Sequence, residues 1–361
     1  MKRILVTTAG GGVGNNLIRG LLRSRKYALE IIGTNIDKFY LARSLAHKNY
    51  LVPRADAGDA YIEAIRRIVD DEHIDLIIVG NDAEVGPVSK YRDRFGAKVL
   101  LPSPETIERC QDKLTLNAHL AGQGIPVAET HPVTTIDEMD SVFQHFAGDD
   151  LVWCRMRQGS ASKGSLPVKT LEQARAWVSY WRDMRGVPPE MFLLCEYLPG
   201  RDYAFQSLWH NGELVLAKTC ERLSYLVGEW MPSGTTSTPR VGRLVNDDRV
   251  NELCTRAVQS IDERATGMFC IDLKENRDGV PCITEINIGR FFMISPIFNF
   301  VGKYNMAELY LDVAFGEQVH IPQSERFGDI GEEETLLVRE LDHEPAVLTA
   351  AEVEKRFISL V

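Results

Sequence analysis

The sequence predicts an α/β domain with a parallel sheet, followed by an α+β region of short strands, hairpins and helices. Over the first hundred of its 361 residues, β-branched strands alternate with amphipathic helical segments, a pattern typical of βαβ units. A helix that follows Pro104 then ends at the stop signal Gly124-Ile125-Pro126. Beyond it, strands follow one another through hairpin turns such as Asn211-Gly212. We therefore place a domain boundary near residues 105–112.

The elements of the first domain alternate in the order that a parallel sheet requires. Strands are expected at residues 3–8, 30–35, 50–53, 76–79 and 98–101, and helices at residues 13–24, 61–71 and 104–122. In the α+β region, strands are expected at residues 151–155, 192–196, 204–209 and 213–218, and helices at residues 171–182, 244–264 and 307–314. Residues 317–361 are polar and acidic, and one amphipathic helix is expected at their end.

The charge and the cysteines exclude several classes of function. The net charge is −10, which disfavours nucleic acid and anionic membranes as partners because both require a basic face. No apolar stretch is long enough to span a bilayer. The seven cysteines form no CxxC pair, so we expect most of them to be small core residues in a reducing cytoplasm, and we expect no zinc. The eight histidines show no spacing typical of metal ligands, and none is assigned a function.

A glycine-rich loop, residues 8–15, follows the first strand and opens the first helix. Glycines at such a turn let the backbone approach a phosphate at a helix N-terminus. The spacing Gly-x-Gly-x-x-Gly is not met, because Asn15 stands where the third glycine belongs. Two interpretations stay open here: a tight strand–helix turn of a doubly wound sheet, or the cofactor loop of a nicotinamide-dependent oxidoreductase. The second lacks the Tyr-x-x-x-Lys pair that such enzymes often use.

The most informative stretch is a hairpin with acidic side chains, residues 267–287. Asp278-Gly279 between two apolar strands predicts a two-residue turn. In that register Asp272 lies directly opposite Glu285, and Asn287 projects from the same face as Glu285. Directly opposed like charges destabilise a sheet unless a further partner is present. Two carboxylates with an amide oxygen are a ligand set for Mg²⁺.

An alternative for this hairpin stays open. Both carboxylates could face solvent on an edge hairpin, or a longer turn could shift the register. Pro281 in the second strand confines that position to an edge or an unpaired site.

A second loop of small residues, Gly159 to Gly164, follows a strand that carries Arg155 and Arg157. Arginine on a strand can hold a guanidinium toward phosphate, and the amides of a Gly/Ser loop can fold over it. The alternative is an ordinary flexible hairpin tip, and the Walker pattern Gly-x-x-x-x-Gly-Lys-Ser/Thr is absent. Upstream, Asp112-Lys113 is by itself only a charged pair on a helix.

In this order the pieces resemble the ATP-grasp superfamily, and most closely the branch of the carbamoyl-phosphate-synthase large chain and biotin carboxylase. The resemblance covers roughly residues 1–316. It implies a Rossmann-like pre-ATP-grasp domain over residues 1–111, followed by an ATP-grasp fold of two α+β subdomains. These are a lid over residues 112–190 and a C-terminal subdomain with the metal site over residues 191–316, with an acidic extension over residues 317–361. In that family the N-terminal glycine turn belongs to a domain that usually does not hold the nucleotide.

The resemblance also implies roles for individual residues: two basic residues and a loop at the phosphates, a linker at adenine and an acid at the ribose. The residues so matched to ATP are Lys113, Arg155, Gly159, Ser160, Ala161, Ser162, Lys163, Gly164, Glu196, Leu198 and Asp202. Asp272, Glu285 and Asn287 match the magnesium ligands, so the predicted hairpin falls on the metal site of the family. Lys218 and Arg222 follow a strand that borders the nucleotide, and we expect Lys218 to contact ATP and Arg222 to contact substrate. Residues 230–240 are polar enough for a loop on the substrate side.

The chain departs from the family pattern at three positions. Met156 stands where proline is usual, and Ala161 replaces a glycine of the loop. The arginine that usually lies two residues past the asparagine is Gly289 here, and Arg290 follows one place later. The catalytic role matched to Arg290 therefore depends on a local irregularity such as a one-residue bulge.

The resemblance implies an ATP-dependent carboxylate–amine ligase in the cytoplasm. Its substrates would be a small carboxylate and an amine, joined through an acyl phosphate, with ATP and two Mg²⁺ ions (or Mn²⁺) as cofactors; a homodimer is compatible with this reading. Three alternatives stay open: an acyl- or carbamoyl-phosphate-forming subunit of a larger synthase, a nicotinamide-dependent oxidoreductase built on the first domain, and a non-catalytic ATP-binding regulator.

Overall fold

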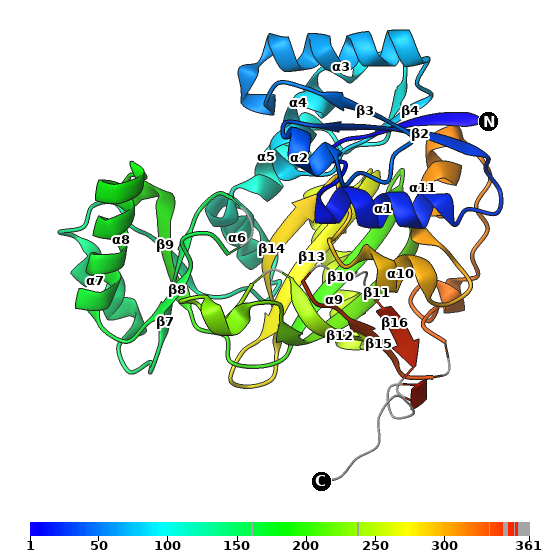
Figure 1. Cartoon of the computed structure of the whole chain (residues 1–361). Helices are drawn as coiled ribbons and strands as arrows, with labels where there is room; N and C mark the ends of the chain where they lie inside the picture. Colours follow the sequence, from blue (N-terminus) through cyan, green and yellow to red (C-terminus); the bar gives the residue numbers. More distant parts are fainter. Residues whose placement is uncertain (160–161, 237, 332, 342–345, 350, 353–361) are drawn as a thin grey trace, which may run out of the picture.

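Three β-sheets organise the part of the chain that the structure describes (Figure 1). The computed structural model describes residues 1–159, 162–236, 238–331, 333–341, 346–349 and 351–352. Their sheets have the strand orders β3-β2-β1-β4-β5, β6-β9-β7-β8 and β14-β13-β10-β11-β12-β15-β16. The first is entirely parallel, and the other two are antiparallel. The predicted succession of an α/β domain and an α+β region is confirmed.

The first domain is a doubly wound sheet with helices on both faces. Its strands are β1 (Lys2–Val6), β2 (Leu29–Asn35), β3 (Lys48–Leu51), β4 (Leu76–Ile78) and β5 (Lys98–Val99), and its helices are α1 (Gly12–Leu22), α2 (Lys38–Leu41), α3 (Asp59–Glu72) and α4 (Asp82–Lys90). Along β1, Leu5 packs into one apolar cluster while Ile4 and Val6 pack into another. Both faces of the strand are therefore buried, which is why it reads as a continuous apolar run.

Two helices lead from this domain to the next. The sequence predicts one helix over residues 104–122, but the structure has α5 (Pro104–Gln111) and α6 (Lys113–Gly122). Between them Asp112 is extended, and its side chain accepts hydrogen bonds from the amides of Leu114 and Thr115. An aspartate that caps a new helix at this point ends the preceding one, and this local competition is invisible to apolar periodicity.

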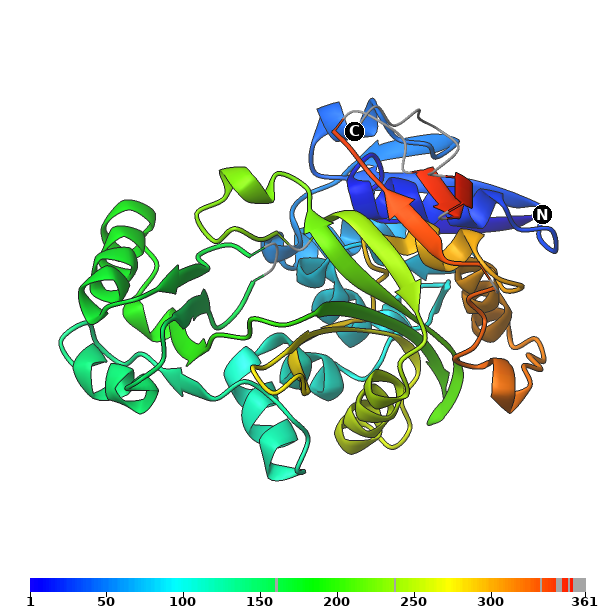
Figure 2. The same cartoon turned by 90° about the horizontal axis from the view of Figure 1, so that it is seen from below.

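The second sheet and its helices form a small unit with its own core, which we call the lid after the expectation above. It contains β6 (Thr130–Pro132), β7 (Val152–Met156), β8 (Leu166–Val168) and β9 (Phe192–Glu196), with the helices α7 (Met139–Phe143) and α8 (Leu171–Arg185). The core includes Cys154, Val178 and Phe192, all fully buried. Figure 2 shows this lid to one side of the large sheet.

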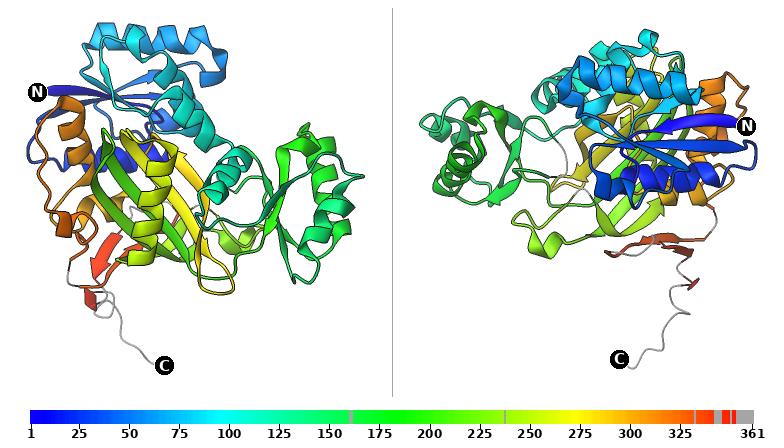
Figure 3. Two further views of the ribbon diagram at one scale, coloured as in Figure 1. Left: turned by 180° about the vertical axis from the view of Figure 1, so that it is seen from behind. Right: turned by 45° about the horizontal axis from the view of Figure 1, so that its top comes forward.

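The third sheet is the largest element of the molecule. Its strands are β10 (Asp202–His210), β11 (Glu213–Tyr225), β12 (Pro239–Val245), β13 (Gly267–Glu275), β14 (Pro281–Ile288), β15 (Thr335–Val338) and β16 (Ala346–Thr349). The helices of this region are α9 (Asp248–Ile261), α10 (Ser295–Phe300) and α11 (Met306–Phe315). Figure 3 shows α10 and α11, in orange, along one side of the large sheet and next to the first domain, where both helices contact α1. The large sheet thereby shares one apolar cluster with the first domain.

Two expectations for this region are wrong. The helix expected over residues 244–264 begins only at Asp248, because Leu244 and Val245 belong to β12 and Asp247 caps the helix. In the acidic extension, β15 and β16 add two strands to the sheet where none was expected. An amphipathic helix is expected at the end of this extension, and residues 353–361 at that end lie outside the described residues.

All seven cysteines are buried and free, as predicted. Among the described residues, no helix is both long and apolar enough to cross a membrane.

A buried ion pair attaches the segment after α11 to the large sheet. The Lys218 ammonium lies 2.8 Å from the Asp329 carboxylate and donates to the carbonyls of Val301 and Tyr304. The Lys218 side chain has no exposed surface, and 2% of that of Asp329 is exposed. Burial lowers the pKa of Lys218, whereas the charge of Asp329 opposes that shift. The pair is complete within the protein, and neither group is available to a ligand.

Loss of one partner should therefore destabilise the fold. Lys218→Met leaves the Asp329 carboxylate buried without a cation, and we expect a loss of about 3–5 kcal/mol in the free energy of unfolding, measured by urea denaturation. The double variant Lys218→Met/Asp329→Asn removes both charges and should recover part of that loss. A single variant within about 1 kcal/mol of the wild type would contradict this role for the pair.

Candidate active site

The β13–β14 hairpin brings Asp272 opposite Glu285, as the sequence predicts. The predicted two-residue turn is nevertheless wrong. The Asn276 amide donates to the Val280 carbonyl, so the loop has three residues, and the Asn276 side chain accepts from the amides of Asp278 and Val280. A bulge then adds one residue in β14 between the pairs that Leu273 and Asp272 make. The longer turn and the bulge compensate, which restores the predicted pairing.

The two carboxylates and Asn287 share one face of this hairpin. The Asn287 side-chain amide donates to Asp272 at 2.7 Å. β14 is an edge strand of the large sheet, so Pro281 lies at an edge, as the sequence predicts for a proline within a strand. The alternative of solvent-facing carboxylates is excluded, because residue exposure is 8% at Asp272 and side-chain exposure is 18% at Glu285.

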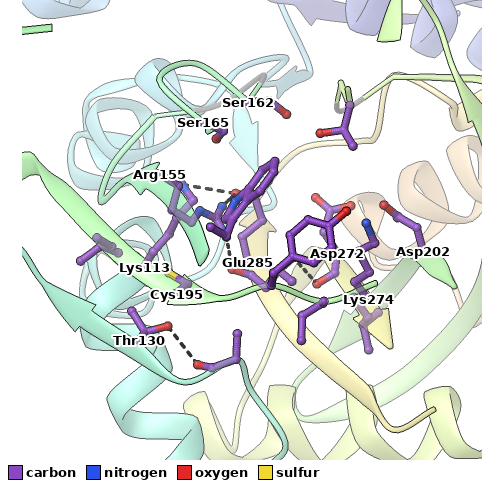
Figure 4. A pocket seen from close by; sticks show the side chains of 18 of the residues that line it. Lys113, Thr130, Arg155, Ser162, Ser165, Cys195, Asp202, Asp272, Lys274 and Glu285 are labelled. Carbon is purple, nitrogen blue, oxygen red and sulfur yellow. Dashed lines mark hydrogen bonds and ion pairs between the residues drawn. The ribbon is translucent and has the colours of Figure 1, made fainter. Parts of the chain in front are cut away.

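Cations from three segments surround the acidic pair. Arg155 on β7 lies 2.8 Å from the Glu285 carboxylate, and Lys113 at the start of α6 lies 3.3 Å from it. Arg222 on β11 pairs with both Asp272 and Asp202. Figure 4 shows Arg155 and Lys113 beside Glu285, with Asp272 on its other side. The like charges of the hairpin are balanced by cations from the lid, from α6 and from β11, which lies two strands away from β13 in the sheet.

Burial and these cations separate the pKa values of the two acids. Burial raises the pKa of Asp272 to about 7, although the Arg222 guanidinium opposes this shift. Burial would also raise the pKa of Glu285, but the charges of Lys113 and Arg155 hold it well below its usual value. A proton shared by the pair therefore resides on Asp272.

A pocket between the lid and the large sheet opens onto this pair. Its lining includes most of the residues that the sequence matched to ATP, metal or substrate. Those found there are Lys113, Arg155, Gly159, Ser162, Lys163, Glu196, Leu198, Asp202, Arg222, Asp272 and Glu285. From the loop predicted for the substrate side, Thr235 and Thr236 also line it. The roles assigned to these residues stay predictions, but the tertiary structure places their side chains around one space.

The remaining predicted residues lie elsewhere. Ser160 and Ala161 are outside the described residues. The Gly164 carbonyl accepts from the Trp177 indole at 2.9 Å, on the side of the lid core. Lys218 is wrong as an ATP contact, because it is buried against Asp329 and does not line the pocket. Asn287 reaches the pocket only through its hydrogen bond to Asp272.

Arg290 is held between two domains. Its guanidinium pairs with Asp82 of the first domain at 2.6 Å and donates to the side-chain oxygen of Asn287 at 2.5 Å. Gly289, directly before Arg290, has a φ of +74°, a left-handed backbone conformation that supplies the local irregularity expected for the displaced arginine. A Cβ at this position would lie 2.7 Å from the Val85 side chain. Arg290 thus contacts the predicted metal ligand Asn287, although it lies one residue after the position of the usual family arginine.

The N-terminal glycine loop is filled by the chain itself. A Cβ at Gly10 would lie 1.7 Å from the Tyr40 carbonyl oxygen, and one at Gly14 would lie 2.4 Å from the Thr8 carbonyl oxygen. Asp37, at the end of the next strand, caps α2 through the Phe39 amide. These contacts favour the tight strand–helix turn over a dinucleotide loop.

Sequence reasoning missed several residues that line the pocket: Thr130, Trp153, Tyr197, Tyr225 and Lys274. The Lys274 ammonium lies 5.6 Å from the Tyr197 ring centre, and that ring lies 6.2 Å from Trp153. Burial lowers the pKa of Lys274. Lys274 could have been found, because it lies two residues from Asp272 on one strand face. The others reach the site only through the packing of separate strands.

Comparison with known proteins agrees with this arrangement. No protein-family model and no curated protein sequence matches the chain. Solved structures match it over nearly its whole length, and the chain has the ATP-grasp fold, with a parallel-sheet domain before it. The fold predicted from the sequence is confirmed.

Three of these structures illustrate the likeness. Carboxyaminoimidazole ribonucleotide synthase from Aspergillus clavatus, solved with ATP, is 15% identical with a TM-score of 0.68, over 93% of this chain and 81% of that one. L-Amino acid ligase from Bacillus licheniformis is 12% identical with a TM-score of 0.68, over 94% and 79%. The biotin carboxylase domain of 2-oxoglutarate carboxylase from Hydrogenobacter thermophilus, solved with MgADP, ADP and bicarbonate, is 14% identical with a TM-score of 0.72, over 94% and 74%. At such identities the likeness establishes the fold alone.

The pKa of Asp272 can be tested directly. In protein free of nucleotide and divalent metal, we expect its carboxyl group to titrate near pH 7, followed by NMR of ¹³C-labelled aspartate and assigned with Asp272→Asn. The exposed Asp278 in the hairpin loop serves as an internal comparison. Titration of Asp272 below pH 5 would contradict the effect of burial described above.

Proposed function

We propose that the chain is an ATP-dependent carboxylate–amine ligase that forms an amide or peptide bond through an acyl phosphate. The observation that carries this proposal is the meeting of Lys113 and Arg155 with the Asp272–Glu285 pair in one pocket between the lid and the large sheet. The printed descriptions of similar structures name ATP or MgADP, and one names an amino acid ligase. The domain limits expected from the sequence, at 111/112, 190/191 and 316/317, accompany this proposal.

The residues present fit a magnesium nucleotide. Asp272, Glu285 and the side-chain oxygen of Asn287 would hold Mg²⁺, a hard cation that prefers oxygen ligands. Each of these three groups is now paired with a cation, namely Arg222, Arg155 with Lys113, and Arg290. The bound metal supplies charge neutralisation of the phosphate oxygens. Lys113 and Arg155 would then turn from Glu285 to the phosphates.

The proposed chemistry asks mainly for positioning and charge balance. A carboxylate oxygen of the substrate attacks the γ-phosphorus, the bond from that phosphorus to the bridging oxygen breaks, and ADP leaves. The amine nitrogen then attacks the acyl carbon, the bond to phosphate breaks, and the nitrogen loses a proton. Arg222 and Arg290 border the acidic pair on the side of β11 and the first domain and would face the substrate carboxylate. A nucleophilic cysteine is not required, and all seven are buried.

Nucleotide affinity tests the assignment of β7 to the phosphates. Arg155→Ala removes a charge-assisted hydrogen bond, so we expect the affinity for ATP to fall by roughly 10- to 100-fold, measured by isothermal titration calorimetry. Arg182→Ala, on the exposed face of α8 in the same lid, is the matched control and should bind as the wild type does. Unchanged affinity in Arg155→Ala would show that this strand does not face the phosphates.

Turnover tests the reaction itself. Wild-type protein should release phosphate from ATP when offered the right pair from a panel of amino acids and short peptides. Glu285→Gln keeps the shape of the side chain but removes a metal ligand, and we expect at least ~100-fold slower release. Near-normal turnover in Glu285→Gln would overturn the metal assignment. Tight ATP binding without phosphate release for every pair in the panel would favour the alternative of a non-catalytic ATP-binding regulator.

A further inference from the structure

A cluster of metal-binding side chains lies on the lid, apart from the nucleotide pocket. Glu129 directly precedes β6, His131 lies within β6, and His145 lies in the 3-10 helix η3 (Gln144–Phe146). One potential ligand atom from each lies within 4.8 Å of the other two. None of the three lines the pocket that holds Asp272 and Glu285.

The backbones that carry the two histidines are fixed by the lid core. His131 pairs with Leu194 in the β6–β9 ladder. Phe146, next to His145, is 3% exposed and packs edge-on against the His131 ring, with ring centres 5.7 Å apart. The two imidazoles are therefore brought together by packed elements and not by a chance meeting of loops.

The side chains already interact with one another. His131 Nε2 lies 2.7 Å from the Glu129 carboxylate, and the His131 and His145 rings stack with centres 3.9 Å apart at 19°. His145 and Glu129 are exposed and His131 is half-buried, so water can complete a coordination shell.

We infer that Glu129, His131 and His145 form a binding site for a divalent transition-metal ion, with Zn²⁺ as the representative. Two nitrogens and one oxygen suit zinc and its neighbours, whereas Mg²⁺ prefers a shell of oxygens. Ligand atoms around tetrahedral zinc lie ~3.3 Å apart, given bonds of about 2.0 Å. Rotation of the exposed His145 and Glu129 side chains closes the present separation, and the metal replaces the His131–Glu129 hydrogen bond.

The site goes beyond the proposed ligase reaction, yet it borders the pocket. The Glu196 amide donates to the Glu129 carbonyl at 2.8 Å, and Thr130, between two of the ligands, lines the pocket. A metal ion would clamp β6 to η3 and stiffen the strand beside the nucleotide. It would thus be a structural or regulatory ion of the lid.

Zinc binding can be measured without nucleotide. The full chain, with any affinity tag removed, is titrated with Zn²⁺ by calorimetry in millimolar Mg²⁺, which occupies oxygen-rich sites. We expect one equivalent to bind. Co²⁺ in place of Zn²⁺ should give d–d absorption without thiolate charge-transfer bands, because all seven cysteines are buried. Absence of binding by the wild type, or a thiolate band, would overturn the inference.

Variants locate the site. His145→Asn, at an exposed position, should weaken zinc binding at least ~10-fold, and Glu129→Gln provides a second test at another exposed ligand. His210→Asn, an exposed histidine outside the cluster, is the matched control and should bind as the wild type does. Glu285→Gln should also retain zinc binding, so failure of the ligase proposal leaves this inference intact. Unchanged affinity in both His145→Asn and Glu129→Gln, or lost affinity in Glu285→Gln, would refute it.

Discussion

The pairing of two carboxylates across one hairpin is the constraint on which the centre of this molecule depends. Asp272 and Glu285 face each other on β13 and β14, where like charges alone would push the strands apart. The fold balances them with Arg155 from the lid, Lys113 from α6 and Arg222 from β11. Each cation comes from a different element, so the same charge requirement orients the lid, the connecting helix and the large sheet around one pocket.

Arg290 links the first domain to this arrangement of charges. Arg290 pairs with Asp82 just beyond β4 and also contacts Asn287 on the acidic hairpin. The strand order of the first sheet reverses between β1 and β4, and such a switch point is where the carboxyl ends of parallel strands leave a crevice. Asp82 therefore brings the usual ligand-facing edge of a doubly wound sheet close to the acidic hairpin, while the glycine loop of that domain is filled by its own backbone.

The lid contributes more than a cover. Its side toward the pocket presents Arg155 and Gly159, and the Gly159 carbonyl accepts a hydrogen bond from Lys113 at 2.7 Å. The imidazole cluster lies outside that pocket, yet it shares β6 and the Glu129–Glu196 backbone contact with it. The Mg²⁺ ligands proposed on the large sheet are all oxygens, whereas two of the three Zn²⁺ ligands proposed on the lid are nitrogens, so the two proposed sites suit different ions.

Local patterns determined the alternation of strands and helices, the burial of the cysteines and the opposition of Asp272 and Glu285, because periodicity and hairpin pairing act between near neighbours in the chain. The opposition of Asp272 and Glu285 nevertheless depends on two irregularities that compensate each other. Asn276 closes a turn that is one residue longer than expected, and the bulge in β14 restores the predicted pairing. Tertiary structure alone decided that Lys218 is a buried partner of Asp329, that Arg290 reaches Asp82, and that His131 meets His145. The ion pairs join residues a hundred or more positions apart, and the histidines lie in different elements. Desolvation and charge pairing depend on which segments pack together, which no local spacing of residues records.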